Sequence, residues 1–308
     1  MNKLTKISMT ALSTALIAGS VQAMDYSISG GASIAYTSVN TTSDTNPWSM
    51  GDSITFSTSG ELDNGMTVSV SLEMDDHGSD AIDDKSIKID TGNGVIGFAS
   101  SVGGIGGIGT IANKVPNAFT PVFQATNAVD YGQADQKMSS AGQWGYKHTV
   151  GGVGISLGYT PGGNTNGGAD TGWSLSYADL IDGMEVGYGQ QDDGTTSESE
   201  TAYVKYVTGG ITVAYQKSKV DYESTGTSDE DATHYGISLA VNDDLSVSVG
   251  RMDVEIGTSA SEEENTGVSA SYTMGSVKIG LGFNKAANVG GSAGVDNEAT
   301  AGSITFSF

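Results

Sequence analysis

Apolar and polar residues alternate along most of the chain. The clearest stretch, residues 66–75, reads Met-Thr-Val-Ser-Val-Ser-Leu-Glu-Met-Asp, with apolar side chains at even positions and polar ones at odd positions. Successive side chains of a β-strand point to opposite faces, so this pattern predicts a strand with one apolar and one polar face. Sixteen such stretches predict sixteen strands, at residues 25–37, 50–62, 65–75, 84–91, 93–100, 142–150, 153–160, 171–178, 183–190, 200–208, 210–220, 232–241, 244–252, 266–274, 276–284 and 299–308.

The connections between these stretches alternate strictly in length. Short turns follow the even-numbered strands, and sequences such as Asp63-Asn64-Gly65 and Gly209-Gly210 tolerate the positive φ of tight hairpins. Long polar connections follow the odd-numbered strands, and the longest is 101–141. Bacterial outer-membrane barrels have short turns on one side and long loops on the other.

The polar faces of the predicted strands consist largely of Ser, Thr and Gly, which favours a lipid-facing exterior and a watery interior. In lipid each unpaired backbone group costs several kcal/mol, so the first strand must pair with the last. The predicted fold is therefore all-β, a sixteen-stranded antiparallel transmembrane β-barrel. Aromatic residues share the apolar positions, as expected of interfacial girdles: Tyr26, Tyr36, Tyr146, Tyr159, Trp173, Tyr177, Tyr188, Tyr215, Tyr235, Tyr272 and Phe283.

The first 23 residues form a separate segment. Lys3 and Lys6 precede an apolar run and the small-residue site Val21-Gln22-Ala23, which predicts a secretory signal peptide. Its removal would leave one barrel domain, residues 24–308, and lower the net charge from −23 to −25. No later segment approaches the roughly eighteen uninterrupted apolar residues that a spanning helix requires.

Composition narrows the possible functions. The hydrophobic fraction, 37%, lies below the roughly 45–50% typical of globular proteins, as expected for a water-filled barrel without a large core. The chain has no cysteine, which excludes disulfides, thiolate metal sites and cysteine nucleophiles. Its strongly acidic balance argues against nucleic acid or anionic lipid as a partner.

The last strand carries the signature of a known family. Residues 301–308 end in Phe308, with Phe306 and Ile304 at alternate positions, and resemble the signal that the barrel assembly machinery reads. The layout of residues 24–308, including Ile28-Ser29-Gly30-Gly31-Ala32, is similar to that of the alphaproteobacterial relatives of the general diffusion porins. The resemblance implies a homotrimer in the outer-membrane lipid, with the third loop folded into the pore. It also implies passive diffusion of small hydrophilic solutes and ions.

The same resemblance suggests which residues narrow the pore. In that family, acids on the third loop face a basic cluster on the opposite wall, and this chain offers Asp130 and Asp135 on the loop. Lys88 and Lys147 match the wall positions by strand, although strand 2 carries no base and the only arginine, Arg251, falls on an outward position. Further lumen charges are expected on the polar face: Glu61, Glu73, Asp90, Glu185, Lys205 and Lys278. The acid excess predicts a mild preference for cations that weakens at high salt.

Other chemistry is not expected. The acidic runs of the long loops could hold Ca²⁺, but none has the spacing of a calcium loop, so we predict no metal or cofactor. Residues 104–109 fit G-x-G-x-x-G but lead into a Pro-interrupted loop instead of the helix of a dinucleotide site. The histidines, His77, His148 and His234, are interpreted as surface residues, and no G-x-S-x-G elbow accompanies them, so an enzyme is not predicted.

Two alternatives to a general diffusion pore remain. A porin-like channel for one solute class would have the same sequence pattern, because solute choice depends on where a few side chains converge. A soluble acidic adhesin built of β-hairpins would share the composition, but neither the alternation of turns and loops nor the terminal phenylalanine.

Overall fold

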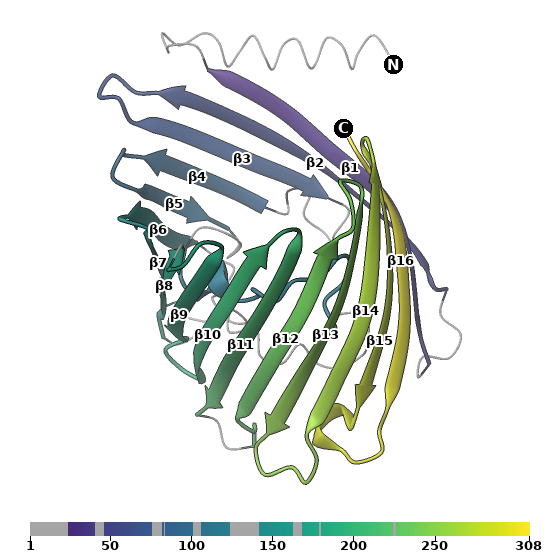
Figure 1. The fold of residues 1–308 in the computed structure, drawn as a ribbon. Helices are drawn as coiled ribbons and strands as arrows, with labels where there is room; N and C mark the ends of the chain where they lie inside the picture. Colours follow the sequence, from purple (N-terminus) through teal and green to yellow (C-terminus); the bar gives the residue numbers. More distant parts are fainter. Residues whose placement is uncertain are drawn as a thin grey trace.

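A computed structural model describes residues 24–40, 46–75, 82, 84–100, 106–123, 142–162, 168–178, 180–223 and 226–308. Sixteen antiparallel β-strands form one closed barrel in chain order (Figure 1). The strands are β1 (Asp25–Val39), β2 (Trp48–Glu61), β3 (Thr67–Asp75), β4 (Asp84–Asp90), β5 (Val95–Ala99), β6 (Gln143–Val150), β7 (Val153–Thr160), β8 (Asp170–Ala178), β9 (Met184–Asp192), β10 (Ser197–Thr208), β11 (Ile211–Tyr222), β12 (Glu230–Ala240), β13 (Leu245–Ile256), β14 (Glu263–Met274), β15 (Val277–Ala287) and β16 (Asn297–Ser307). Two short 3₁₀ turns, η1 (Ile108–Ile111) and η2 (Val289–Gly291), complete the described structure.

The barrel closes through β1 and β16, as the sequence predicted. The two strands pair antiparallel from Gly31 opposite Ser307 to Val39 opposite Ala299. This pairing leaves neither terminal strand with an open edge, which is the condition for a sheet surrounded by lipid. Within the described residues, no helix is long and apolar enough to cross a membrane. The predicted signal peptide, residues 1–23, lies outside the described residues.

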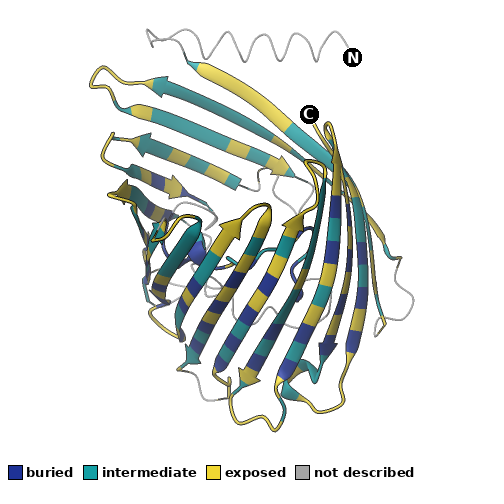
Figure 2. Cartoon of the chain, viewed as in Figure 1, coloured by how far each residue is buried: buried dark blue, intermediate teal, exposed yellow. Residues whose placement is uncertain are grey.

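Exposure alternates along the strands with a period of two, which confirms the predicted inward and outward faces. On β11, the outward Val213 and Tyr215 are 44% and 45% exposed, whereas the inward Gln216 and Ser218 are 3% exposed. Figure 2 shows the alternation as dark and yellow bands along β10 to β15. The outward positions are apolar or aromatic along most of the wall, so the surface that meets lipid is separated from a polar interior.

The strands β10 to β16 extend farther toward the long loops than the alternation predicted. Beyond the row of outward aromatic side chains, the outward positions become polar, and the outward apolar pattern that marks a strand ends, whereas inward positions there include the buried Val220, Met252 and Val254. Outward-facing ion pairs between neighbouring strands occupy this region: Lys217 with Asp231 at 3.9 Å, Arg251 with Glu264 at 3.0 Å and Lys285 with Glu298 at 3.9 Å. Cross-strand charge pairs continue the sheet where the hydrophobic pattern no longer shows it.

Candidate functional site

Residues 106–123, here called the lining segment, lie against the inward-facing side of the barrel wall. The segment belongs to the long connection between β5 and β6 and crosses behind β10 to β12 in the view of Figure 1. Its contacts begin at β7, where a Cβ at Gly106 would lie 1.9 Å from the Leu157 carbonyl oxygen, and reach β16, where Phe119 packs on Ala299 and Ala301. Strands across more than half of the barrel are therefore in contact with this segment.

One carboxamide on β11 holds the start of the lining segment. Gln216 Nε2 donates hydrogen bonds to the carbonyl oxygens of Ile111 at 2.9 Å and Ala112 at 2.8 Å. Its Oε1 accepts a hydrogen bond from the backbone N–H of Lys114 at 2.8 Å. Gln216 therefore satisfies three main-chain groups that would otherwise lie unpaired against the wall.

A second carboxamide, on β15, holds the end of the segment in the same way. Asn284 Nδ2 donates to the carbonyl oxygens of Pro121 and Val122, both at 2.8 Å. Between the two carboxamides, serine hydroxyls of the wall accept main-chain hydrogen bonds, with Ala118 N donating to Ser248 Oγ and Phe119 N to Ser269 Oγ. The segment is thus fixed by its main chain at several points along its length.

Glycines on the inner wall leave room for the side chains of the lining segment. A Cβ at Gly280 of β15 would lie 2.0 Å from the Phe119 ring, and one at Gly236 of β12 would lie 2.8 Å from Val115 Cγ1. Real Cβ atoms do not approach other atoms so closely, so any larger residue would displace the Phe119 or Val115 side chain.

Apolar side chains of the segment pack on an apolar part of the inner wall. Val122 and Phe123 form a buried cluster with wall residues that include Met252 and Val254. The Phe123 ring lies 5.8 Å from the His234 imidazole in a T-shaped arrangement, and His234 is only 8% exposed. The expectation that His234 is a surface residue was therefore wrong, because the lining segment covers it.

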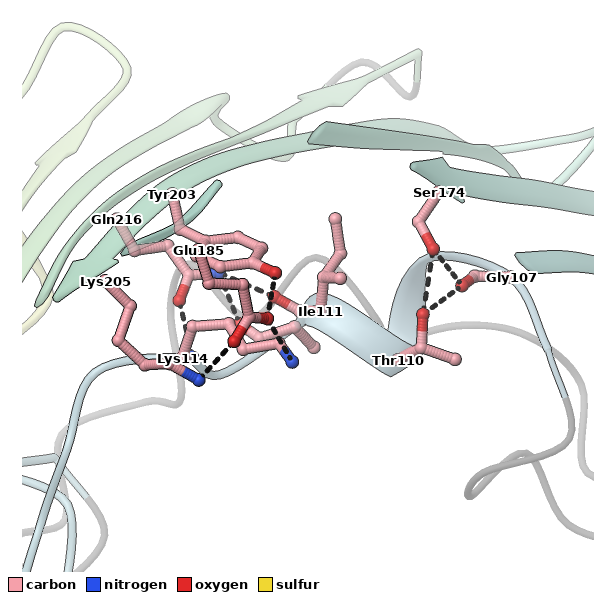
Figure 3. A network of polar contacts seen from close by, with 10 residues as sticks. Gly107, Thr110, Ile111, Lys114, Ser174, Glu185, Tyr203, Lys205 and Gln216 are labelled. Carbon is pink, nitrogen blue, oxygen red and sulfur yellow. Dashed lines mark hydrogen bonds and ion pairs between the residues drawn. The ribbon is translucent and has the colours of Figure 1, made fainter. Parts of the chain in front are cut away.

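Glu185 of β9 joins the lining segment to two further wall residues (Figure 3). Its Oε2 lies 2.5 Å from Lys205 Nζ of β10, and its Oε1 lies 3.4 Å from Lys114 Nζ of the segment. Tyr203 donates a hydrogen bond from its hydroxyl to Glu185 Oε1 at 2.5 Å, and Lys114 Nζ lies 5.4 Å from the centre of its ring. Two ammonium groups thus face one carboxylate, and the lining segment supplies one of them.

A second group of charges lies toward β4 and β6. Lys88 of β4 pairs with Gly97 of β5, and Lys147 of β6 pairs with Val95 of β5. These two lysines therefore stand on inward positions on either side of β5. Low-dielectric walls strengthen the field of such a group several-fold compared with bulk water.

The model of the Gram-negative porin family matches residues 8–307. The chain belongs to the Gram-negative porin family. Its fold is similar to that of a triple mutant of the Rhodopseudomonas blastica porin, with a TM-score of 0.67 and 13% identity over 92% of this chain and 100% of that one. It is also similar to OmpT, an outer membrane protein of Vibrio cholerae, with a TM-score of 0.66 and 12% identity over 94% of this chain and 100% of that one. No curated protein matches the chain by sequence.

As a Gram-negative porin, the protein is an outer-membrane channel protein. The predicted all-β, sixteen-stranded antiparallel barrel is confirmed, and so is the resemblance to porins. The porin family and fold are those of non-enzymatic channels. In the described part of the porin, no three His, Asp or Glu side chains gather closely enough to hold a metal ion.

The porin carries eight of the predicted lumen charges on inward positions of described strands: Glu61, Glu73, Lys88, Asp90, Lys147, Glu185, Lys205 and Lys278. Of these, Glu185 and Lys205 form an ion pair, and Lys88 lies near enough to Lys147 to act on it. Asp130, Asp135 and His77 lie outside the described residues. The roles of all these groups in solute passage stay predictions.

Four residues of this porin site were not predicted from the sequence: Lys114, Tyr203, Gln216 and Asn284. Gln216 and Asn284 fall on the polar positions of their strands, where Ser, Thr and Gly predominate. The one available signal was a carboxamide among these small residues. Its side chain is long enough to form hydrogen bonds with the main chain of a segment that lies on the wall. Nothing in the local pattern distinguished Lys114, whose partner Glu185 is 71 positions away.

The predicted assembly signal lies on the outer face at the end of the porin chain. Ile304 and Phe306 of β16 are outward and 40% and 43% exposed, and Phe308 is 74% exposed. Their recognition by the barrel assembly machinery stays a prediction. In the folded barrel, the same strand forms the seam with β1.

Proposed function

We propose that this porin forms a water-filled channel through which small hydrophilic solutes and ions diffuse passively across the outer membrane. The observation that carries the proposal is the inner face of the barrel, where hydroxyls, glycines and charged groups face one another across the lumen. The lining segment narrows this lumen from one side, because it occupies the inner face from β8 to β16. Solutes then pass along the opposite arc, β1 to β5.

The channel prefers cations mildly. Described carboxylates outnumber lysines on the inward positions, which raises the local concentration of cations over that of anions. The carboxylates are Asp25, Glu61, Glu73, Asp75, Asp84, Asp90, Asp170, Glu185, Glu230 and Glu263, against Lys88, Lys147, Lys205, Lys278 and Lys114 of the lining segment. A preference of this origin weakens as salt shortens the screening length to about 3 Å near 1 M.

Planar-bilayer recording tests both statements. Purified porin in a bilayer should give discrete conductance steps, and the reversal potential across a potassium chloride gradient should have the sign of a cation-preferring pore. A chloride-selective channel would contradict the cation preference but not the pore. Absence of conductance from heat-modifiable, folded protein would contradict the pore itself.

A channel for a particular solute class is the second candidate. The gathered lysines near Lys147 and the pairing of Lys114 with Glu185 favour it, because they place fixed charges on one side of the path. Liposome swelling with sugars, amino acids and carboxylates of similar size distinguishes the candidates. A general pore admits solutes by size, whereas a selective one ranks them by charge.

We also infer a homotrimer. β4 has seven residues and β5 has five, and a five-residue strand tilted by about 45° crosses only about 12 Å of an apolar band about 25 Å tall. A second copy packed on the outward Ile87, Ile96 and Phe98 would cover this low part of the wall. Molar mass in detergent, measured by light scattering, should be three times that of one chain. A monomer in every detergent would contradict the inference.

A further inference from the structure

His234 of β12 is a titratable side chain that the proposed channel does not use. It occupies an inward position, where it pairs with Gln216 of β11 and Met252 of β13. An inward side chain on the wall of a water-filled barrel normally meets water, but His234 is only 8% exposed. The lining segment covers it, and the Phe123 ring lies 5.8 Å from the imidazole. The burial of this histidine therefore depends on where the lining segment lies.

The space beside the imidazole is too small to hydrate a charge. A cavity of about 10 Å³ lies between His234 and residues 115–117 and 120–122 of the lining segment. A single water molecule needs about 10–15 Å³. The lining segment therefore leaves room for at most one water molecule at this point of the wall.

The described groups that face His234 are neutral. Residues 115–123 of the lining segment include no titratable side chain. The wall around the imidazole consists of Gln216, Ser248, Gly250, Met252, Gly267 and Ser269. None of these groups can carry a negative charge opposite a protonated imidazole.

Charged groups farther along the wall do not compensate a proton on His234. Glu230, the inward carboxylate of β12, is four positions away, about 13 Å along the strand. Glu263 of β14 accepts hydrogen bonds from Asn265 and Gly290. Lys114, which pairs with Glu185, has the same sign of charge as a protonated histidine. While the segment covers it, a protonated His234 is therefore without a counter-charge among the described residues.

Proton uptake by His234 and its cover by the lining segment oppose each other. Burial without water or a counter-charge disfavours the charged form of an ionisable group. When the segment lies off β12, the same imidazole faces the water of the lumen and takes up a proton near pH 6.5, as an exposed histidine does. A proton therefore stabilises the state in which the segment is off the wall.

We propose that His234 is a pH-sensitive switch beneath the lining segment. Proton uptake by its imidazole releases Val122 and Phe123 from β12, and the released residues lie in the lumen and lower the conductance. This inference goes beyond the proposed function but rests on it, because the current flows through the water-filled barrel. Attachment is favoured above about pH 6.5. Below that pH the ratio of released to attached molecules rises by up to about tenfold per pH unit, because the released state takes up the proton.

Single-channel recording between pH 7.5 and pH 4.5 tests the switch. At constant salt and voltage, the ratio of time in reduced-conductance states to time at full conductance should be constant above about pH 7 and rise steeply below about pH 6.5. His234→Gln, which stays neutral at every pH, should remove this rise. His148→Gln, on the outer face of β6, is the matched control and should keep it. Comparing the variants separates the switch from the gradual titration of the lumen carboxylates.

Thiol labelling measures release of the segment without using the current. The chain has no cysteine, so Val122→Cys introduces a single thiol at a position that is 5% exposed. At each pH, its labelling rate in detergent is divided by that of the double variant Val122→Cys, His234→Gln, because the thiol chemistry is the same in both. This quotient should be about one at pH 7.5 and rise in acid. Heat-modifiable gel mobility identifies variants that fail to fold.

The outcomes separate the switch from the pore. Conductance and labelling quotient that do not change with pH overturn the switch and leave the pore intact. An equal acid response in wild type and His234→Gln also overturns it, because another group then takes up the proton. Acid-dependent labelling with unchanged conductance overturns the closure, because the released residues then leave the path open. Folded protein without any conductance overturns the pore, and the labelling quotient still shows whether His234 controls the segment.

Discussion

The backbones of Phe308 and Gly30 exchange two hydrogen bonds. Gly30 N donates to Phe308 O at 2.8 Å, and Phe308 N donates to Gly30 O at 2.9 Å. The Phe308 ring lies over Gly30, where a Cβ would be 2.9 Å from its Cε2 atom and 2.8 Å from the Ser53 carbonyl oxygen. The last residue of the chain therefore completes the seam between β16 and β1, and glycine at position 30 provides the space for it.

Gly30→Ala should weaken this seam. The added methyl group must displace either the Phe308 ring or the backbone of β2, at a cost of about 1–3 kcal/mol. The temperature at which the folded band disappears from a semi-native gel should fall. Gly302→Ala is the matched control, because a Cβ there would lie 3.3 Å from a flexible Leu281 side-chain atom and at an ordinary contact distance, 3.6 Å, from the Gly280 carbonyl oxygen. Equal effects of the two substitutions would contradict a special role for position 30.

Gln216→Leu should loosen the start of the lining segment. The carbonyls of Ile111 and Ala112 lose their partner, and unpaired buried groups cost about 1–3 kcal/mol each. We expect faster hydrogen exchange of the Lys114 amide and more current noise in single-channel traces. Gln190→Leu, at an outward position of β9, should change neither measurement. Unchanged exchange in Gln216→Leu would show that the segment is held by its apolar contacts instead.

Glu185→Gln should shift ion selectivity toward anions. The substitution removes the carboxylate that faces Lys114 and Lys205 and leaves both ammonium charges in the lumen. The reversal potential in a potassium chloride gradient should move toward the chloride potential. Glu255→Gln, on the outer face of β13, serves as the control for loss of one negative charge. If both variants shift the potential equally, Glu185 does not face the ion path.

Asp193 should keep the loop between β9 and β10 ordered in acid. Partial burial alone would raise its pKa, but hydrogen bonds from the Thr196 side chain and from the backbone of Thr196, Ser197 and Thr195 hold the pKa well below its usual range. A lowered folded-state pKa contributes stability that is present above the unfolded value, about 3.9, and is lost only as pH falls through the folded value.

Hydrogen exchange at residues 195–197 measures this loop directly. Protection should persist at about pH 4, where an unperturbed aspartate is half protonated, and should disappear at lower pH. Asp193→Ala should remove the protection even at neutral pH, whereas Asp182→Ala, in a short turn at the other end of the barrel, should not. Loss of protection at pH 4 in the wild type would contradict the lowered pKa.

The number, order and facing of the strands could be predicted because they depend on local chemistry. A period of two fixes which side chains face lipid, and Gly, Asn and Asp in the turns fix where each hairpin reverses. The ends of β10 to β16 could not be placed, since their outward positions carry charge pairs such as Arg251 with Glu264 in place of the apolar residues that mark the rest of the wall.

The attachment of the lining segment could not be read from the sequence. Gln216 and Ile111 are 105 positions apart, and Asn284 and Pro121 are 163 positions apart, so no local pattern joins them. His234 was misjudged for the same reason, because its burial comes from Phe123 and not from its own strand. The described lumen charges lie on the inward positions of their strands, but their partners depend on how the barrel closes and their roles stay predictions.

Gln216 and Asn284 hold carbonyl oxygens of the lining segment, and these groups are the same whatever side chain a residue carries. The position of the lining segment is therefore set by its main chain, and the chemistry that it presents to the lumen is set by its side chains. Exchanging a side chain such as that of Lys114 alters the charge that faces the lumen, while the hydrogen bonds from Gln216 and Asn284 to the main chain remain. Point mutations in the lining segment can therefore change the side chains that face the lumen without removing the main-chain hydrogen bonds that hold the segment on the wall.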